Sequence, residues 1–166
     1  MICDECGKAE YIETHENHRY LESGLPNIVL ESVLIRRCPA CGSHLVTIPR
    51  MTELHRSVAV RLIKKRARLA PQEVTFLRKS LNWSKPEFAK KMHVKQEQIY
   101  RWESLTNHKP MMIQSELLLR AFVALDKKIN DYDDQVDDSG TVETPDLSPF
   151  SMVFNKGWHD HSLLAG

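Results

Sequence analysis

The sequence contains no run of about 18 apolar residues, the length that a membrane-spanning helix needs, so we expect no membrane segment. It has no basic-then-apolar segment at its N-terminus, which argues against a secretory signal. We therefore expect a cytoplasmic protein in a reducing setting. Cysteine is scarce, with four residues in 166, and under reducing conditions such cysteines are more often metal ligands than disulfides.

The sequence also lacks the patterns that suggest catalysis. No paired carboxylates and no nucleophile beside a base indicate a reaction, so we expect no enzymatic activity and no catalytic residue. One enzymatic alternative is left open, because a CxxC pair can act as a redox dithiol. Two matched copies without a strand–helix–strand context argue against it.

Two short cysteine motifs stand near the ends of the first 50 residues. The chain opens with CDECG and later reads CPACG, with 31 residues between Cys6 and Cys38. Two residues between the cysteines let both sulfurs bind one metal ion, and the following glycine can take the positive φ that closes the turn. Four thiolates fill a tetrahedral shell and leave no open position for catalysis. We therefore predict a structural zinc ion bound by Cys3, Cys6, Cys38 and Cys41.

Residues 1–50 are predicted to form a small β module around this metal. Runs bounded by turn residues predict four strands, at residues 11–20, 27–30, 33–37 and 45–48. A segment of this size buries little core, so we expect metal ligation to supply most of its stability. Three nearby histidines are expected to be exposed, with metal ligation as the alternative: His15, His18 and His44.

The stretch 69–109 has the pattern of three short helices. Apolar residues from Val74 to Leu81 recur at helical spacing behind Pro71, which suits a first helical position. Ser84 and Glu87 form a capping box that predicts the start of a second helix. The alternative is a helical bundle with a coincidental turn.

The third helix is expected at 96–104, after a turn at His93, a residue type that tolerates positive φ. Ile99 and Trp102 fall on its inner face, and the opposite face carries side chains that read base edges in the DNA major groove. Gln suits adenine, Arg suits guanine and Glu suits cytosine. The expected DNA-binding residues, including three lysines placed to contact phosphates, are Lys85, Lys95, Gln96, Glu97, Tyr100, Arg101 and Lys109.

These motifs carry two resemblances. Residues 84–103 resemble the helix-turn-helix of the lambda-repressor-like (XRE) class, with His93 at its usual turn glycine and Lys95 at its usual Ser/Thr cap. Residues 1–130, with both CxxCG motifs ahead of this element, resemble the MqsA (YgiT-type) antitoxin family. That resemblance implies a zinc module that binds a toxin, and a helix-turn-helix that dimerises and represses its own operon.

The second resemblance also bears on individual residues. Arg101 matches a base-reading arginine of the family, whereas Glu97 stands where the family has a base-reading asparagine. A carboxylate repels phosphates and prefers the amino group of cytosine. The family's operator sequence therefore does not carry over to this chain.

Charge is divided unevenly along the chain. Residues 51–130 hold 17 Lys/Arg against 7 Asp/Glu, a net charge of +10, whereas residues 1–50 have a net charge of −2 and residues 131–166 of −7. A basic middle segment is the footprint of a DNA-binding domain. The cations that end the expected connector helix either approach DNA phosphates or face water: Arg61, Lys64, Lys65, Arg66 and Arg68.

The last predicted helix starts near Ser115 and is apolar beyond one stripe. Its apolar residues are Leu117, Leu118, Leu119, Phe122, Val123, Leu125 and Ile129. Such a helix needs two partners, and we predict that one is the helix-turn-helix core and the other a second copy of the chain. A two-fold dimer would place two recognition helices about 34 Å apart and implies a palindromic site.

The segment 131–166 is acidic and is expected to begin as a disordered tail. It regains apolar character from residue 150, more than a solubilising tail needs, which favours docking on the zinc module, on the dimer mate or on a partner. The tract 159–161 (His-Asp-His) suggests a metal site, with an exposed tract as the favoured reading. The family resemblance does not cover this tail.

Together these features predict an α+β chain in four parts. These are a zinc-ribbon-like β module at 1–50, a linker helix at 51–68, an all-α lambda-repressor-like helix-turn-helix and dimerisation domain at 69–130, and the tail. The predicted function is transcriptional repression on a palindromic double-stranded DNA operator, as a homodimer and as the antitoxin of a type II pair with a small toxin. The alternative is a stand-alone zinc-containing regulator without a toxin.

Overall fold

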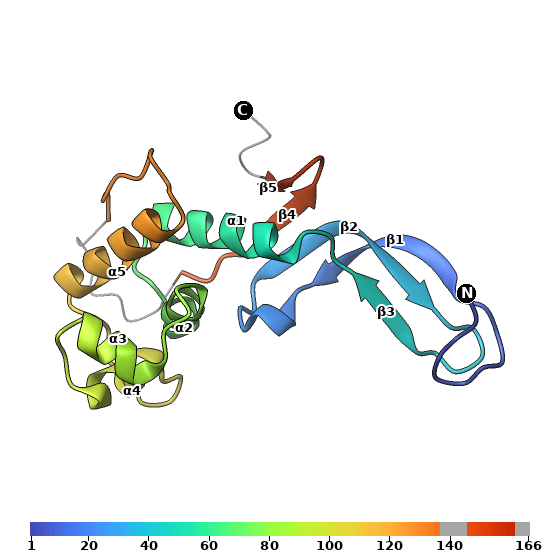
Figure 1. The fold of residues 1–166 in the computed structure, drawn as a ribbon, viewed down its shortest axis with the longest axis horizontal. Coiled ribbons are helices and arrows are strands. Elements are labelled where there is room, and N and C mark those ends of the chain that lie inside the picture. The colour runs from blue at the N-terminus through green and yellow to red at the C-terminus, as the bar shows by residue number, and fades with distance from the viewer. Residues whose placement is uncertain (137–145, 162–166) are drawn as a thin grey trace.

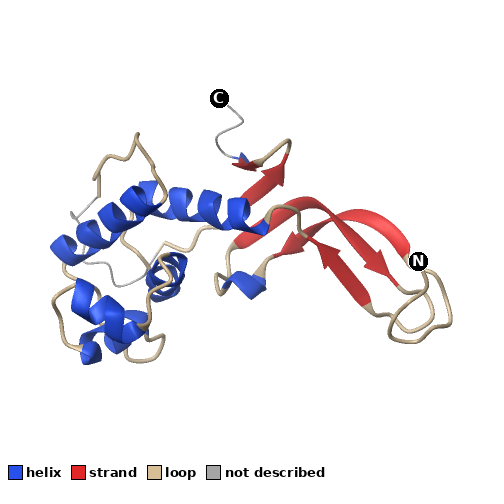
Figure 2. Cartoon of the chain, viewed as in Figure 1, coloured by secondary structure: helices blue, strands red, loops and turns tan. Residues whose placement is uncertain are grey.

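The structure, a computed structural model, describes residues 1–136 and 146–161. It is an elongated α+β arrangement, with a twisted sheet reaching to one end and a group of helices at the other (Figure 1). The N-terminus and the loop after β2 lie at the far end of the sheet, opposite to α3 and α4. Strand and helix are segregated, and α1 runs from the sheet to the helices (Figure 2).

Within the described residues the strands and helices follow the predicted order, with two strands added at the C-terminal end. The strands are β1 (Ile12–Arg19), β2 (Ile28–Arg37), β3 (His44–Thr47), β4 (Phe150–Phe154) and β5 (Trp158–Asp160). The helices are α1 (Met51–Lys64), α2 (Pro71–Ser80), α3 (Lys85–Lys91), α4 (Gln96–Glu103) and α5 (Ile113–Asp126), with a short 3₁₀ turn at Leu21–Ser23. Among the described residues, no helix combines the length and the apolar character that crossing a membrane requires.

The sheet is built around β2. β1 pairs with β2 antiparallel along one edge. On the other edge β3 pairs antiparallel with residues 34–37, and β4 pairs parallel with residues 28–31. β5 then pairs antiparallel with β4. The two ends of the chain therefore share one sheet.

The two strands expected at 27–30 and 33–37 are one continuous strand. The polar residues between them interrupt the apolar pattern, and the pairing with β1 shifts there but continues on both sides. Ser32 takes a φ of 53°, and the side-chain oxygen of Asn17 in β1 accepts its N–H across 3.1 Å. A local irregularity thus stands where the sequence pattern suggested a break.

α1 joins the sheet to the helices through one continuous core. Its buried residues are Leu54, Val58, Ala59, Leu62 and Ile63. The same core includes Leu30 of β2, Leu77 of α2 and Val123 of α5. The helix expected at 51–68 ends at Lys64, so its last residues form a loop that leads to α2.

α2, α3 and α4 begin at the residues expected from the sequence, whereas α5 begins at Ile113, two residues before the expected Ser115. Ser84 Oγ accepts the N–H of Glu87 at 3.3 Å, and the Glu87 carboxylate accepts the N–H of Ser84 at 2.7 Å. His93 takes a φ of 54° in the turn between α3 and α4. Lys95 gives α4 no side-chain cap, but Gln98 Oε1 accepts its N–H at 3.3 Å.

A buried charged cluster ties α5 to the loop between α1 and α2. The Arg120 side chain, 1% exposed, pairs with Glu116 at 2.6 Å. Arg68 pairs with the same carboxylate at 2.6 Å. Arg120 also donates to three backbone carbonyls, those of Ile63, Lys65 and Ala67. Because a buried charge is costly unless it is fully paired, this cluster fixes the path of the loop.

The C-terminal segment is part of the fold. Phe150, Met152 and Trp158 of the β4–β5 hairpin are buried. The Trp158 indole N–H donates to the carbonyl of Pro49 at 2.8 Å. Of the three docking partners considered for this end of the tail, the structure shows the first, the chain's own β module, and it adds a contact with α1 that was not expected. The rest of the predicted tail, residues 137–145 and 162–166, lies outside the described residues.

Candidate functional site: a four-cysteine centre and an exposed helix face

The two CxxCG motifs form matching turns at the far end of the sheet. In each turn the glycine N–H donates to the carbonyl of the first cysteine, Gly7 to Cys3 at 2.8 Å and Gly42 to Cys38 at 2.9 Å. The φ angles of Gly7 and Gly42 are 62° and 76°, a region that glycine adopts without a Cβ clash. Both turns therefore present their thiols in the same way.

The four sulfur atoms gather at one point. They all lie within 4.8 Å of one another. The close pairs are Cys3 with Cys41 at 3.7 Å and Cys6 with Cys38 at 3.6 Å. A tetrahedral centre with metal–sulfur bonds of about 2.3 Å has sulfur–sulfur edges of about 3.8 Å. The arrangement therefore fits one tetrahedrally coordinated metal ion.

Hydrogen bonds around the sulfurs give the cysteine thiols different pKa values. The Ser43 hydroxyl lies 3.3 Å from Cys3 Sγ and 3.2 Å from Cys41 Sγ. Its hydrogen bonds lower the pKa of both thiols, that of Cys3 to about 5. At Cys6 a backbone hydrogen bond from Lys8 favours the thiolate, but burial and the neighbouring sulfurs raise the pKa to about 11. A bound metal cation favours the thiolate form at every ligand.

Two residues beside the sulfurs were not expected from the sequence. Ser43 contacts two of the sulfurs, and a hydrogen bond with Cys3 raises the pKa of the Tyr11 hydroxyl. Side chains that contact ligand atoms orient them and tune the metal. The only sequence feature that could have indicated Ser43 is its position directly after the second CxxCG motif.

The histidines considered as alternative ligands do not join the cysteines. Within the residues that the structure describes, the group of His, Cys, Asp and Glu side chains able to hold a metal ion consists of the four cysteines. At the His-Asp-His tract, His161 Nδ1 lies 2.8 Å from the Glu31 carboxylate. That contact joins the hairpin to β2 and does not bring a third ligand.

The second site is built on α4, whose inner face is fixed to α2 and α3. Ile99 and Trp102 are 0% and 5% exposed, and Trp102 meets the Phe88 ring of α3 edge to face, with centroids 6.0 Å apart. Arg78 of α2 donates to both carboxylate oxygens of Glu103, at 2.5 and 3.1 Å. Since this ion pair is buried, breaking it would leave an uncompensated charge. The pair therefore holds α4 in one orientation.

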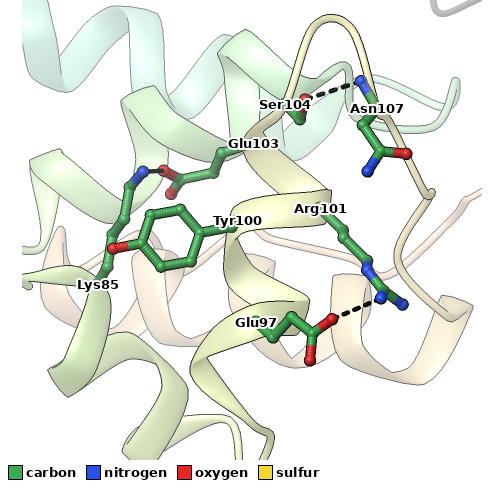
Figure 3. A pocket seen from close by; sticks show the side chains of 7 residues that line it. All are labelled: Lys85, Glu97, Tyr100, Arg101, Glu103, Ser104 and Asn107. Carbon is green, nitrogen blue, oxygen red and sulfur yellow. Dashed lines mark hydrogen bonds and ion pairs between the residues drawn. The ribbon is translucent and has the colours of Figure 1, made fainter.

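The opposite face of α4 is open to solvent, and Figure 3 shows Glu97, Tyr100 and Arg101 projecting from this helix. Glu97 and Arg101 lie one turn apart and form an ion pair at 2.5 Å. Tyr100 is 52% exposed, and Gln96 Nε2 donates to its hydroxyl at 3.4 Å. Lys85 Nζ lies 4.2 Å from the centre of the Tyr100 ring. The structure thus brings these five predicted residues together on one face.

The three lysines expected to contact phosphates lie around this face in different settings. Lys95 precedes α4 and is exposed. Lys109 is exposed in the loop after α4, and its backbone N–H donates to the carbonyl of Arg101 at 3.1 Å. Lys85 is half-buried, with Nζ also 3.7 Å from the Glu103 carboxylate.

Comparisons with known proteins identify no family. The chain was compared with protein-family models, with curated proteins and with solved structures. None of the three comparisons finds a match. The resemblance to the MqsA family therefore stays an interpretation of the motifs.

A hollow of about 450 Å³ lies between α4, the start of α3 and the loop after α4. Its lining residues are Lys85, Glu97, Tyr100, Arg101, Glu103, Ser104 and Asn107. Ser104 and Asn107 were not among the site residues predicted from the sequence. Ser104 Oγ accepts the backbone N–H of Asn107 at 2.9 Å, which shapes the loop (Figure 3). The serine at the end of a helical pattern was a local turn signal.

Proposed function

We propose that the chain is a sequence-specific DNA-binding repressor in which α3 and α4 form a helix-turn-helix. The observation that carries the proposal is the contrast between the two faces of α4. Ile99 and Trp102 are buried, whereas Gln96, Tyr100 and the Glu97–Arg101 pair face solvent. The exposed side chains are of the types that bind base edges, and a major groove admits one α-helix.

Each residue of the exposed face has a role in this proposal. Arg101 donates to the O6 and N7 atoms of guanine, and Glu97 accepts a hydrogen bond from a cytosine amino group. Gln96 pairs with adenine, and Tyr100 packs beside it. The lysines at 85, 95 and 109 contact phosphates and set the register of α4 on the duplex.

We propose that the four cysteines bind zinc in a structural role. Tetrahedral thiolate sites favour zinc or iron–sulfur centres, and two CxxC turns around one ion are typical of structural zinc. Four protein ligands leave no position for a substrate. The ion stabilises the far end of a narrow sheet, where β1, β2 and β3 have little core of their own.

We propose that the chain binds DNA as a two-fold dimer through α5. Leu118 and Leu125 lie on the outer side of this helix and are 40% and 77% exposed, and Met112 just before it is 70% exposed. Exposed apolar residues that recur along one helix face favour association. A two-fold dimer would read a palindromic operator.

The order of the two sites, with the resemblance to the MqsA family, supports the further proposal that the repressor is the antitoxin of a type II pair. The zinc module would then bind a small toxin. Since β3 and β4 already pair with one edge of β2, a toxin would meet the outer edge of another strand or the solvent face of the sheet. Without a toxin, the same two sites describe a stand-alone zinc-containing regulator.

The proposal is tested with Arg101→Ala on a duplex that the wild-type chain selects from a random pool. Loss of a bidentate arginine–guanine contact costs about 1–3 kcal/mol of discrimination, so affinity should fall roughly 5- to 150-fold on this duplex. The control is Arg19→Ala, which removes an exposed arginine from β1. An equal loss of affinity on selected and on random DNA would show that Arg101 contacts a phosphate and does not read a base.

A further inference from the structure

The basic stretch that ends α1 and leads to α2 has partners within the chain for all five of its cations. Lys65 pairs with buried Glu73 at 2.5 Å, and Arg68 pairs with buried Glu116. These two contacts belong to the core. The other three cations, Arg61, Lys64 and Arg66, lie nearer the surface and contact residues that follow α5.

Those contacts come from both ends of the C-terminal segment. Lys64 Nζ meets the Asp131 carboxylate at 2.5 Å, and Arg66 donates to Gln135 Oε1 at 3.0 Å. At the other end, Arg61 pairs with Asp160 at 3.1 Å. Asp131 and Gln135, shortly after α5, therefore lie against the end of the basic stretch, and Asp160 of β5 lies against its first residue.

The part of this segment beside Lys64 and Arg66 is acidic and weakly held. Three of its four residues 131–134 are aspartates. The Asp131 side chain is 77% exposed and that of Lys64 36% exposed, although Lys64 lowers the pKa of the Asp131 carboxyl. Exposed ion pairs are worth about 0–1 kcal/mol, so other anions can exchange with these carboxylates.

The segment stays near the cations because its ends are anchored. Tyr132 packs against the core just after α5, and β4 is paired along β2. Tethering at both ends gives a weak contact an effective concentration of the order of millimolar. Asp131 and Gln135 thus cover Lys64 and Arg66 in the free protein without binding them tightly.

We propose that residues 131–135 act as an intramolecular acidic shield over a second, sequence-independent DNA contact formed by Lys64 and Arg66. Phosphates of duplex DNA carry the same charge as the shielding carboxylates and bind both cations when the shield is displaced. The shield weakens binding to random DNA and so favours the operator, which α4 reads. This inference rests on the proposed DNA-binding function.

The test compares three full-length, zinc-loaded proteins on a random-sequence 20-base-pair duplex at several salt concentrations. The shield variant is Asp131→Asn, Asp133→Asn and Asp134→Asn. A matched variant removes the same charge from exposed sites in the β module: Asp4→Asn, Glu10→Gln and Glu22→Gln. The third protein adds Lys64→Gln and Arg66→Gln to the shield variant. Thermal unfolding followed by circular dichroism checks that each variant folds.

The shield variant should bind random DNA more tightly, with a plot of log affinity against log salt steeper by about 2, since each phosphate neutralised adds about 0.9 to the slope. The matched variant should show a much smaller change, and the two glutamines should cancel the gain. Equal slopes for the shield and matched variants, or a gain that survives Lys64→Gln and Arg66→Gln, would overturn the inference.

A heparin column, eluted with salt, separates this inference from the proposed function. If the wild-type chain selects no DNA sequence but the shield variant elutes from heparin at higher salt than the matched variant, the shield stands and the repressor proposal fails. If the wild-type chain selects an operator and all variants elute together, the repressor stands and the shield fails.

Discussion

Trp158 donates its indole N–H to the carbonyl of Pro49 at 2.8 Å, although the two residues are 109 positions apart. Nearby, the Trp158 backbone N–H donates to Glu53 at 3.1 Å, and Ser57 donates to the Trp158 carbonyl at 3.2 Å. The β4–β5 hairpin thus closes over the start of α1. The hairpin therefore packs with β2 and with the first turns of α1.

Replacing Trp158 should therefore destabilise the whole β module. Trp158 is 3% exposed, and truncating a buried tryptophan to alanine costs about 3–5 kcal/mol. We expect Trp158→Ala to lower the free energy of unfolding in urea by that amount. Phe154→Ala, at a side chain in the same hairpin that is 37% exposed, should cost much less. Equal effects would mean that the hairpin packs loosely on α1.

Metal removal should affect the β module before the helices. The purified chain should contain about one zinc per chain, and Cys38→Ser should abolish stoichiometric binding, because one of four tetrahedral ligands is lost. Treatment of the wild-type protein with a chelator should disorder residues 1–50, which hydrogen exchange measures as a loss of protection there, while α2–α5 stay protected. Metal-free protein that readily forms disulfides would support the redox alternative.

Acid should weaken the junction of β1, α1 and α2 through His55. His55 Nε2 lies 2.9 Å from the Tyr20 hydroxyl, and its ring meets Phe76 edge to face at 5.9 Å. Burial lowers the pKa of His55 below its usual 6.5, so the unfolded chain takes up its proton first. Stability from this group is complete above pH 6.5 and is lost as the pH falls toward the folded-state pKa.

The measurement for His55 is urea unfolding at pH 7.5 and at pH 5.5, with zinc present. The wild-type chain should lose more stability between these pH values than His55→Gln, which keeps a hydrogen-bonding group but does not titrate. The same loss in both proteins would assign the pH dependence to the other histidines or to the cysteines.

The proposed dimer makes a prediction at α5. Leu125 is 77% exposed, so Leu125→Asp should leave the unfolding of the monomer almost unchanged while preventing association. Sedimentation should show a dimer for the wild-type chain at micromolar concentration and a monomer for the variant. Asn130→Asp, which adds the same charge at an exposed site just after α5, is the control for added charge. A wild-type monomer under these conditions would contradict the proposal.

The features that the sequence predicted well are those written in a few neighbouring residues. The capping box of Ser84 and Glu87 fixed the start of α3, and apolar spacing fixed the inward faces of Ile99 and Trp102. The two CxxCG motifs likewise specified two matching turns, because each turn needs only its own glycine. These signals are local, so a single sequence carries them.

The features that the sequence did not reveal depend on distant contacts. Nothing near Phe150 or Trp158 shows that they pair with β2 and α1. Glu116 and Arg120 read as polar positions of an apolar helix, yet both are buried. They are tolerated because the loop before α2 supplies Arg68 and three carbonyls. Because α5 turns the face with Glu116 and Arg120 toward the core, Leu118 and Leu125 lie outside it.

Whether α4 reads DNA is decided by selecting duplexes from a random pool with the wild-type chain and sequencing them. We expect enrichment of a palindrome whose half-sites lie about one helical turn, 10 base pairs, apart. Each half-site should contain a guanine whose preference disappears when Arg101→Ala is used for the selection. A pool that stays random after repeated rounds, or an enriched site unaffected by Arg101→Ala, would contradict base reading by α4.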